Sequence, residues 1–451
     1  MDKKDENGNH SVSFSEDGAS AGLFARRDFV KYLLAGSALS IAAIEKLNAG
    51  VYQAITSLNQ KYVEDISPDG TYWDEIRKMF LFENKLIMMN NGTLGPMPKP
   101  VFNTLMRYFR IQATNPYDLY NFVPGGKEGI RTKLAAFVGA SPDEVSFSSN
   151  TTEGLNLVAN GLDLKEGDEV IVSNLEHPGA INPWNLKAKR TGVKIVQVPF
   201  STPAQSVEQI VNPFAAAVTP RTKIIAVGHT VFITGQITPL KELSKMAHEK
   251  GVLVIGDSAH GIGMLSLDMH AMGVDFFASS PYKWLGAPAG IGLFYVRKEA
   301  QAKLWPTIVS SGWEVDNARK YDPQGQRADA MVYALGEAID FANRIGKERI
   351  ERRIKALAAY FKQGLAKIPG VTINTPTDPY LSAGLTAFLV DGVDSQKIVD
   401  YVFEKYNLVV RTMGGFGAGK PALRVSTPIY ISTREIDMLL EGVATLVRHK
   451  V

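Results

Sequence analysis

The segment GVLVIGDSAH, residues 251–260, places Asp257 directly after a run of residues suited to a buried strand. An ionised carboxylate beside an apolar core is costly unless a cation meets it. Further along the chain, Lys283 stands in the equally apolar segment SSPYKWLGAPAG, residues 279–290, after the strand-like VDFFAS. A lysine in such a place can extend its ammonium group from a loop into solvent, or it can face the aspartate.

The sequence on either side alternates short β-branched runs with segments of helical period, such as PLKELSKMAHEKG at 239–251. This alternation is typical of an α/β fold with a mostly parallel sheet covered by helices, in which ligands bind outside the carboxyl ends of the strands. The strands that end near Asp257 and Lys283 could therefore be neighbours at the ligand-binding edge. The expected buried strands are 143–149, 168–174, 193–200, 223–230, 251–258, 274–279 and 290–297.

Near residue 325 the pattern changes to a long helical stretch followed by short strand signals, which indicates a smaller C-terminal α+β domain. These strand signals lie at 385–390, 407–412 and 422–427. We expect three parts after the N-terminal tail. Residues 50–90 form a segment that packs with the small domain, residues 91–325 form a large ligand-binding domain, and residues 326–451 form the small domain.

Composition limits the classes of function. A chain of 451 residues with 45% hydrophobic residues is long enough for two or three domains. Its net charge of +3 and the lack of a basic cluster argue against nucleic-acid binding. The absence of cysteine excludes disulfides, thiolate metal sites and cysteine nucleophiles. The seven histidines show no spacing typical of metal ligands, so we expect no metal centre.

Residues 1–49 have the composition of a disordered tail followed by an export signal. In ARRDFVK, residues 25–31, the pair Arg26-Arg27 resembles the bacterial twin-arginine signal, which carries folded proteins. The apolar run that follows is shorter than the roughly 20 residues that span a bilayer. We therefore expect export to the periplasm by the twin-arginine machinery, with a membrane anchor if the signal is not cleaved. An amphipathic helix that happens to carry two arginines is the alternative.

Other polar residues also follow predicted strands. Thr151 and Thr152 precede a helical pattern, where backbone N–H groups and hydroxyls can bind an anion, although an ordinary helix cap is the alternative. His177 and His260 lie on loops after two further strands. Pyridoxal 5'-phosphate requires a lysine for its Schiff base, an acid for its pyridine nitrogen and a helix N-terminus for its phosphate. The set of residues at these strand ends meets all three requirements.

Seven motifs, in order, resemble the class V aminotransferases, a pyridoxal-phosphate-dependent family with the aspartate aminotransferase-like fold, fold type I. The resemblance covers roughly residues 85–440 and implies a mostly parallel sheet in a large cofactor-binding domain. The motifs are SNTTEGLN, NLEHPGAINPW, GHTVFITGQITPL, GDSAHGIG, FASSPYKWLGAPAGIGLFYVR, GQRADAMVYALGEAIDF and LRVSTPIY.

The resemblance assigns roles to the residues around the cofactor. It implies that Lys283 forms the Schiff base, that Asp257 pairs with the pyridinium nitrogen and that His177 stacks on the ring. His260 would support the aspartate or the ring hydroxyl. The phosphate would be held by Thr151, Thr152 and Ser280.

The resemblance also indicates a substrate site and a dimer. Arg424 would bind the substrate α-carboxylate through its guanidinium fork, with Asn91 beside it. Gln326 stands where many relatives have threonine after Gly325, in a segment that reaches the phosphate of the partner subunit, so we expect a homodimer. Phe232 stands where desulfurases often have an asparagine beside the cofactor.

The segments WPTIVSSGWEVD (305–316) and GQRAD (325–329) resemble the isopenicillin N epimerase-like branch. This resemblance implies an exported enzyme that acts on an amino acid, or on an amino-acid group of a peptide, through an external aldimine and removal of the Cα proton. The alternatives are transaminase-type modification of a siderophore glutamate and a pyridoxal-phosphate-dependent lyase. A chain without cysteine does not fit a cysteine desulfurase. A periplasmic binding protein is the non-enzyme alternative, but it has no use for this set of polar residues.

Overall fold

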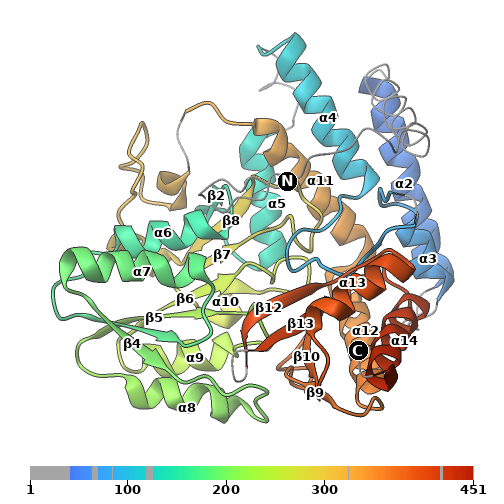
Figure 1. The fold of residues 1–451 in the computed structure, drawn as a ribbon. Coiled ribbons are helices and arrows are strands. Elements are labelled where there is room, and N and C mark those ends of the chain that lie inside the picture. The colour runs from blue at the N-terminus through green and yellow to red at the C-terminus, as the bar shows by residue number, and fades with distance from the viewer. Residues whose placement is uncertain are drawn as a thin grey trace, which may run out of the picture.

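The computed structural model describes residues 41–62, 70–83, 85–117, 125–322, 325–416 and 420–449. The predicted tail and the Arg26-Arg27 pair lie outside these ranges. Within them, Figure 1 shows a large central sheet with helices on both faces and a smaller sheet beside it that carries the C-terminal helices.

The central sheet has seven strands, and the seven strand segments expected from the sequence form it. All strands run parallel except β8, which is antiparallel to both of its neighbours. The α/β prediction is thus confirmed. In spatial order the strands are β2 (Val145–Ser148), β8 (Gly292–Val296), β7 (Phe276–Ser279), β6 (Leu253–Ser258), β5 (Thr222–Gly228), β3 (Glu169–Ser173) and β4 (Lys194–Val198).

The inner strands are mostly apolar because both faces of the sheet are buried there, whereas the edge strand β4 is partly exposed and contains Lys194 and Gln197. Successive side chains of one strand point to opposite faces, so Val254 packs into one core and Ile255 into the other. Helices α6 (Thr151–Gly161) and α7 (Pro178–Thr191) cover the face of Ile255, through residues such as Trp184. Helices α8 (Val207–Ala217), α9 (Leu240–His248) and α10 (Met269–Met272) contribute to the opposite core (Figure 1).

The small domain contains an antiparallel sheet in the order β12 (Arg411–Phe416), β13 (Lys420–Ser426), β10 (Leu385–Val390) and β9 (Val371–Ile373). Each of the three expected strand signals falls on a strand, and the short β9 adds a fourth. Helices α12 (Lys347–Leu365) and α13 (Ser395–Tyr406) pack on this sheet and α14 (Thr433–His449) packs on both of them, whereas α11 (Asp329–Ile345) packs chiefly against helices that precede the central sheet in the sequence.

The N-terminal segment contacts both domains. Helix α2 (Ile41–Lys61) packs on α4 (Lys99–Thr114), where the Asn48 amide donates to Thr104 Oγ1 over 3.2 Å. Strand β1 (Ile87–Met88) pairs with β11 (Leu408–Val409) of the small domain. None of the helices in the described ranges has the length and apolar composition of a membrane span. The remaining elements are α3 (Thr71–Arg77), α5 (Gly126–Val138) and the 3-10 helices Pro142–Glu144, Lys298–Lys303 and Ala318–Tyr321.

Candidate active site

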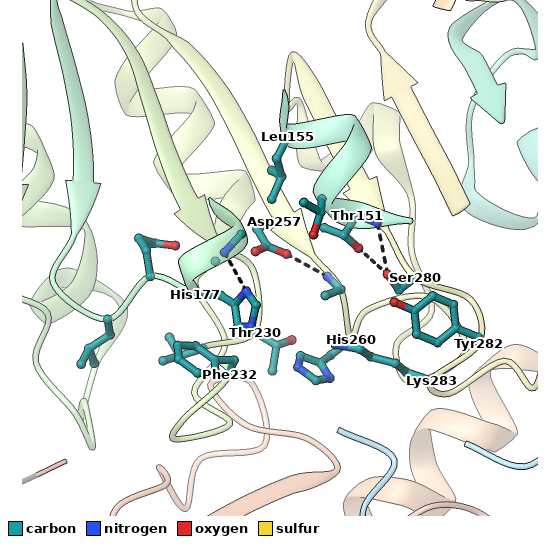
Figure 2. A pocket seen from close by; sticks show the side chains of 17 residues that line it. Thr151, Leu155, His177, Thr230, Phe232, Asp257, His260, Ser280, Tyr282 and Lys283 are labelled. Carbon is teal, nitrogen blue, oxygen red and sulfur yellow. Dashed lines mark hydrogen bonds between the residues drawn. The ribbon is translucent and has the colours of Figure 1, made fainter. Parts of the chain in front are cut away.

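A pocket opens at the carboxyl ends of the central strands, and most of the residues singled out from the sequence line it (Figure 2). Ligands of open α/β sheets bind at this edge. The predicted adjacency is also confirmed, because β6 pairs with β7 and Asp257 lies opposite Ala278. The predicted site residues that line the pocket are Thr151, Thr152, His177, Asp257, His260, Ser280 and Lys283.

The N-terminus of α6 forms an anion cup with the loop after β7. The Thr151 N–H donates to Ser280 Oγ over 3.2 Å, and the two hydroxyl oxygens lie 2.7 Å apart. Both residues are buried, and Asn150 caps the helix by accepting from the Glu153 N–H. Paired hydroxyls at the positive end of a helix suit a phosphate group, as the sequence predicts.

Asp257 is the penultimate residue of β6 and is buried at the floor of the pocket. Its backbone carbonyl accepts from the His229 N–H over 2.7 Å, and its Oδ1 accepts from the Ala259 N–H over 3.1 Å. Burial raises the pKa of Asp257, while the Ala259 N–H and the positive charge of Lys283 oppose that rise. A rigidly held acid of this kind can share a proton with a pyridine nitrogen.

Lys283 lies in the turn that follows β7, where its N–H donates to the Ser280 carbonyl over 3.1 Å. Burial lowers the pKa of Lys283 to about 8, against the opposing attraction of Asp257 and with a smaller contribution from Arg424. Near neutral pH a substantial fraction of the amine is therefore unprotonated, which is the nucleophilic form needed for a Schiff base.

His177 caps α7, and two contacts fix its ring. Its Nδ1 accepts from the Gly179 N–H over 3.0 Å, which places the imidazole proton on Nε2. The Phe232 ring meets it edge to face, with centroids 4.9 Å apart and an interplanar angle of 87°. Burial lowers the pKa of His177 and keeps it neutral. A flat, neutral ring with a fixed orientation suits stacking on a cofactor ring.

Two predicted residues make contacts that the sequence did not indicate. His260 was expected to support Asp257 or the cofactor, but in the described structure its Nδ1 accepts from Trp284 Nε1 over 3.3 Å. Asn91 is buried and both polar atoms of its amide make a hydrogen bond: Nδ2 donates to the Lys283 carbonyl over 2.9 Å and Oδ1 accepts from the Tyr430 hydroxyl. Asn91 therefore positions the lysine turn.

Arg424 comes from β13 and is buried. One guanidinium nitrogen donates to the Phe232 carbonyl over 2.8 Å, whereas Nε has no partner in the described structure. A Cβ atom on Gly92 would lie 2.6 Å from Arg424 Cζ, so only glycine leaves room for the guanidinium group. Burial lowers the pKa of Arg424 to about 10, and the group stays charged at neutral pH.

Glu176 lines the pocket, and the sequence reasoning missed it. Its Oε1 accepts from Ser173 Oγ over 2.5 Å, and burial raises its pKa to about 8, with a further contribution from the charge of Asp257. The available signal was the position of this carboxylate near the carboxyl end of the buried strand β3, comparable to that of Asp257 near the carboxyl end of β6. Gln326 lies in the loop before α11, outside the described lining of the pocket, so its predicted contact with a partner subunit stays a prediction.

The anion cup, the buried acid and the low-pKa lysine fit the three functional parts of pyridoxal phosphate, and together with the fold they define a pyridoxal-phosphate-dependent enzyme of fold type I. The chain belongs to the aminotransferase class-V family, whose model matches residues 89–439.

Similar proteins include two kinds of enzyme. The isopenicillin N epimerase of Amycolatopsis lactamdurans is 30% identical over 397 residues, which cover 83% of this chain and 99% of that protein. A probable cysteine desulfurase of Halalkalibacterium halodurans is 29% identical over 402 residues, covering 82% and 96%. Among solved structures, the apo cysteine desulfurase of Thermococcus onnurineus NA1 matches with a TM-score of 0.75 and 25% identity, covering 83% and 98%.

Proposed function

We propose that this protein removes the Cα proton of an amino acid, or of an amino-acid group in a peptide, and that a proton is then added to the opposite face of Cα, as in an epimerase. The observation that carries the proposal is the position of Lys283, a buried amine with a pKa of about 8 that shares one pocket with Asp257 and whose pKa is lowered in part by the charge of Arg424. An amine with this pKa can accept the Cα proton near neutral pH, and inversion requires that a different group deliver the proton to the other face.

The residues of the chain have separate tasks in this proposal. Pyridoxal phosphate, when bound, supplies the electron-withdrawing ring that acidifies the Cα–H bond. Asp257 keeps a proton at the pyridine nitrogen, and His177 holds the ring plane. Arg424 orients the substrate by its carboxylate, and Lys283 holds the transferred proton at Nζ.

The absence of cysteine favours an epimerase over a cysteine desulfurase, whereas sequence identity does not separate them, since a probable cysteine desulfurase is 29% identical to this chain. The chain has no cysteine, so it lacks the thiol that we expect of a desulfurase nucleophile. Two isopenicillin N epimerases, from Amycolatopsis lactamdurans and Streptomyces clavuligerus, are 30% and 29% identical to it over almost their whole lengths. Transamination, including that of a siderophore glutamate, and lyase chemistry begin with the same proton removal and are the alternatives.

The test is to incubate the purified holoenzyme with L-amino acids and γ-glutamyl peptides in heavy water. An epimerase incorporates deuterium at Cα and forms the D-isomer without loss of the amino group or of a side-chain group. Formation of a keto acid with loss of the amino group would identify a transaminase, and loss of a side-chain group would identify a lyase. No deuterium exchange with any substrate of the panel would refute the proposal.

We also propose export to the periplasm by the twin-arginine route, which accepts a protein already folded around its cofactor. The pair Arg26-Arg27 and the short apolar run after it support this proposal. Ile44 and Asn48 pack as part of α2, so a cleavage that spares the folded domain would fall before Ile44. Replacing both arginines by lysine should leave the enzyme in the cytoplasm; unchanged periplasmic activity in fractionation would contradict export by this route.

A homodimer is the third part of the proposal. Four large apolar side chains in the segment after β8 are exposed in the single chain, and an apolar patch of this kind is typical of a protein interface. They are Trp305, Ile308, Val309 and Trp313, with exposed fractions of 61%, 53%, 63% and 41%. Sedimentation should give a dimer at micromolar concentration, and a fully active monomer would refute it.

A further inference from the structure

Two arginines lie side by side near the pocket. Arg411 of β12 and Arg424 of β13 are directly paired in the antiparallel register, and these two strands are adjacent in Figure 1. Both guanidinium groups contact the same atom, Thr93 Oγ1, at 3.2 Å from Arg411 and 3.5 Å from Arg424. Two positive groups therefore share one small region of the molecule.

No acidic side chain neutralises this pair in the described structure. The hydrogen bonds of the two guanidinium groups all go to neutral oxygens, namely Thr93 Oγ1, the Phe232 carbonyl and the amide oxygen of Asn90. Among the described residues, the buried Nε of Arg424 has no hydrogen-bond partner. Like charges directly opposite each other on two strands destabilise the sheet. Such an arrangement is stabilised by an anion that binds between or beside the two groups.

The two arginines differ in depth. Only 3% of Arg424 is exposed, whereas Arg411 is exposed to solvent. The charge of Arg411 lowers the pKa of both Arg424 and His177, which lines the pocket. The charge of Arg424 in turn contributes to the lowered pKa of Lys283. Lys283, Arg424 and Arg411 thus form a series of positively charged side chains that runs from the buried site toward solvent.

We propose that the substrate is an amino acid, free or within a peptide, that carries a second carboxylate on its side chain. Arg424 binds the α-carboxylate next to Lys283, and Arg411 binds the second carboxylate nearer to solvent. This inference rests on the proposed amino-acid substrate and adds its chemical class. A single arginine is enough to bind an α-carboxylate. The second arginine of the pair, which is exposed to solvent, is therefore available to bind the second carboxylate.

Binding of unreactive acids to the holoenzyme tests the inference apart from turnover. The probes are the dicarboxylates succinate, glutarate and adipate, each compared by calorimetry with the monocarboxylate of the same chain length. Arg411→Gln removes the charge and keeps much of the side chain. The control is Arg448→Gln on α14, an exposed arginine that also donates to a threonine hydroxyl, Thr445.

We expect Arg411→Gln to weaken at least one dicarboxylate about tenfold, because a hydrogen bond to a charged group contributes roughly 1.5–3 kcal/mol. The matching monocarboxylate and the Arg448→Gln control should be unchanged. If the variant weakened the binding of the dicarboxylate and of the monocarboxylate equally, the two arginines would bind one carboxylate together, and the inference would be overturned. Unchanged binding of both acids would also overturn it. Selective weakening without deuterium exchange on any amino acid would support the binding site and refute the proposed reaction.

Discussion

Asn91 Nδ2 donates a hydrogen bond of 2.9 Å to the backbone carbonyl of Lys283, and the two residues are 192 positions apart in the chain. The backbone at Gly95 also approaches the lysine turn closely, since a Cβ atom on Gly95 would lie 2.2 Å from the same carbonyl oxygen. The turn that presents the lysine is thus held from outside the central sheet, by a segment that precedes the first strand of that sheet in the sequence.

Asn91→Leu should therefore reduce turnover about tenfold and the free energy of unfolding by about 1–3 kcal/mol, because it leaves the Lys283 carbonyl and the Tyr430 hydroxyl without their partner. Kinetics and urea denaturation measure the two effects. The control is Asn185→Ala, whose amide donates only to Asn182 on an exposed helix face. An unchanged catalytic rate in a correctly folded Asn91→Leu variant would contradict the positioning role.

Lys283→Ala should remove the covalent link to the cofactor and lower turnover by about 10³ or more. Borohydride reduction of the wild-type holoenzyme, followed by peptide mass spectrometry, should place the label on Lys283. Lys362 is an internal control: burial also lowers its pKa to about 8, but its Nζ donates to the Pro376 carbonyl and to Ser382, and none of these three residues is in the described lining of the pocket. A label on Lys362, or a reducible link in Lys283→Ala, would show that the assignment is wrong.

Asp257→Asn should keep the cofactor bound but slow proton exchange about a hundredfold, because a neutral amide no longer keeps the pyridine nitrogen protonated. Deuterium exchange at saturating substrate, with cofactor content measured in parallel, gives the comparison. Asp268→Asn is a suitable control, since it replaces one good N-cap of α10 by another. Near-normal exchange in a fully loaded Asp257→Asn enzyme would exclude the role.

The pH at which Lys283 loses its proton gives a further prediction. Burial favours the neutral amine, so acetylation of Lys283 in the apoenzyme should rise with pH through a midpoint near 8, below that of ordinary lysines at about 10.4. The charge of Asp257 opposes this shift, and Asp257→Asn should move the midpoint to lower pH. Competitive labelling with mass spectrometry measures both midpoints. A wild-type midpoint near 10 would contradict the buried position.

The sequence was sufficient to predict the central sheet because strands buried on both faces give nearly continuous apolar runs. Asp257 and Lys283 could be singled out because a charged group in an apolar segment is costly unless it meets an opposite charge. Glu176 was missed because its burial depends on β5, a strand that is distant in sequence. The pairing of Arg411 with Arg424 depends on the register of a hairpin, which the sequence does not show. Strands β1 and β9 are too short to show a recognisable strand pattern in the sequence.

The segment from Met89 to Gly95 joins three parts of the molecule. The Met89 carbonyl accepts from the Ser426 N–H and the Gly92 N–H donates to Ser426 Oγ, both on β13, while Asn91 holds the Lys283 turn. A movement of the small domain toward the pocket would therefore pull on the catalytic lysine through this segment. Strand β13, which carries Arg424, and the turn that carries Lys283 are thus coupled through one short segment, so that a closure of the small domain over a ligand would also shift the amine.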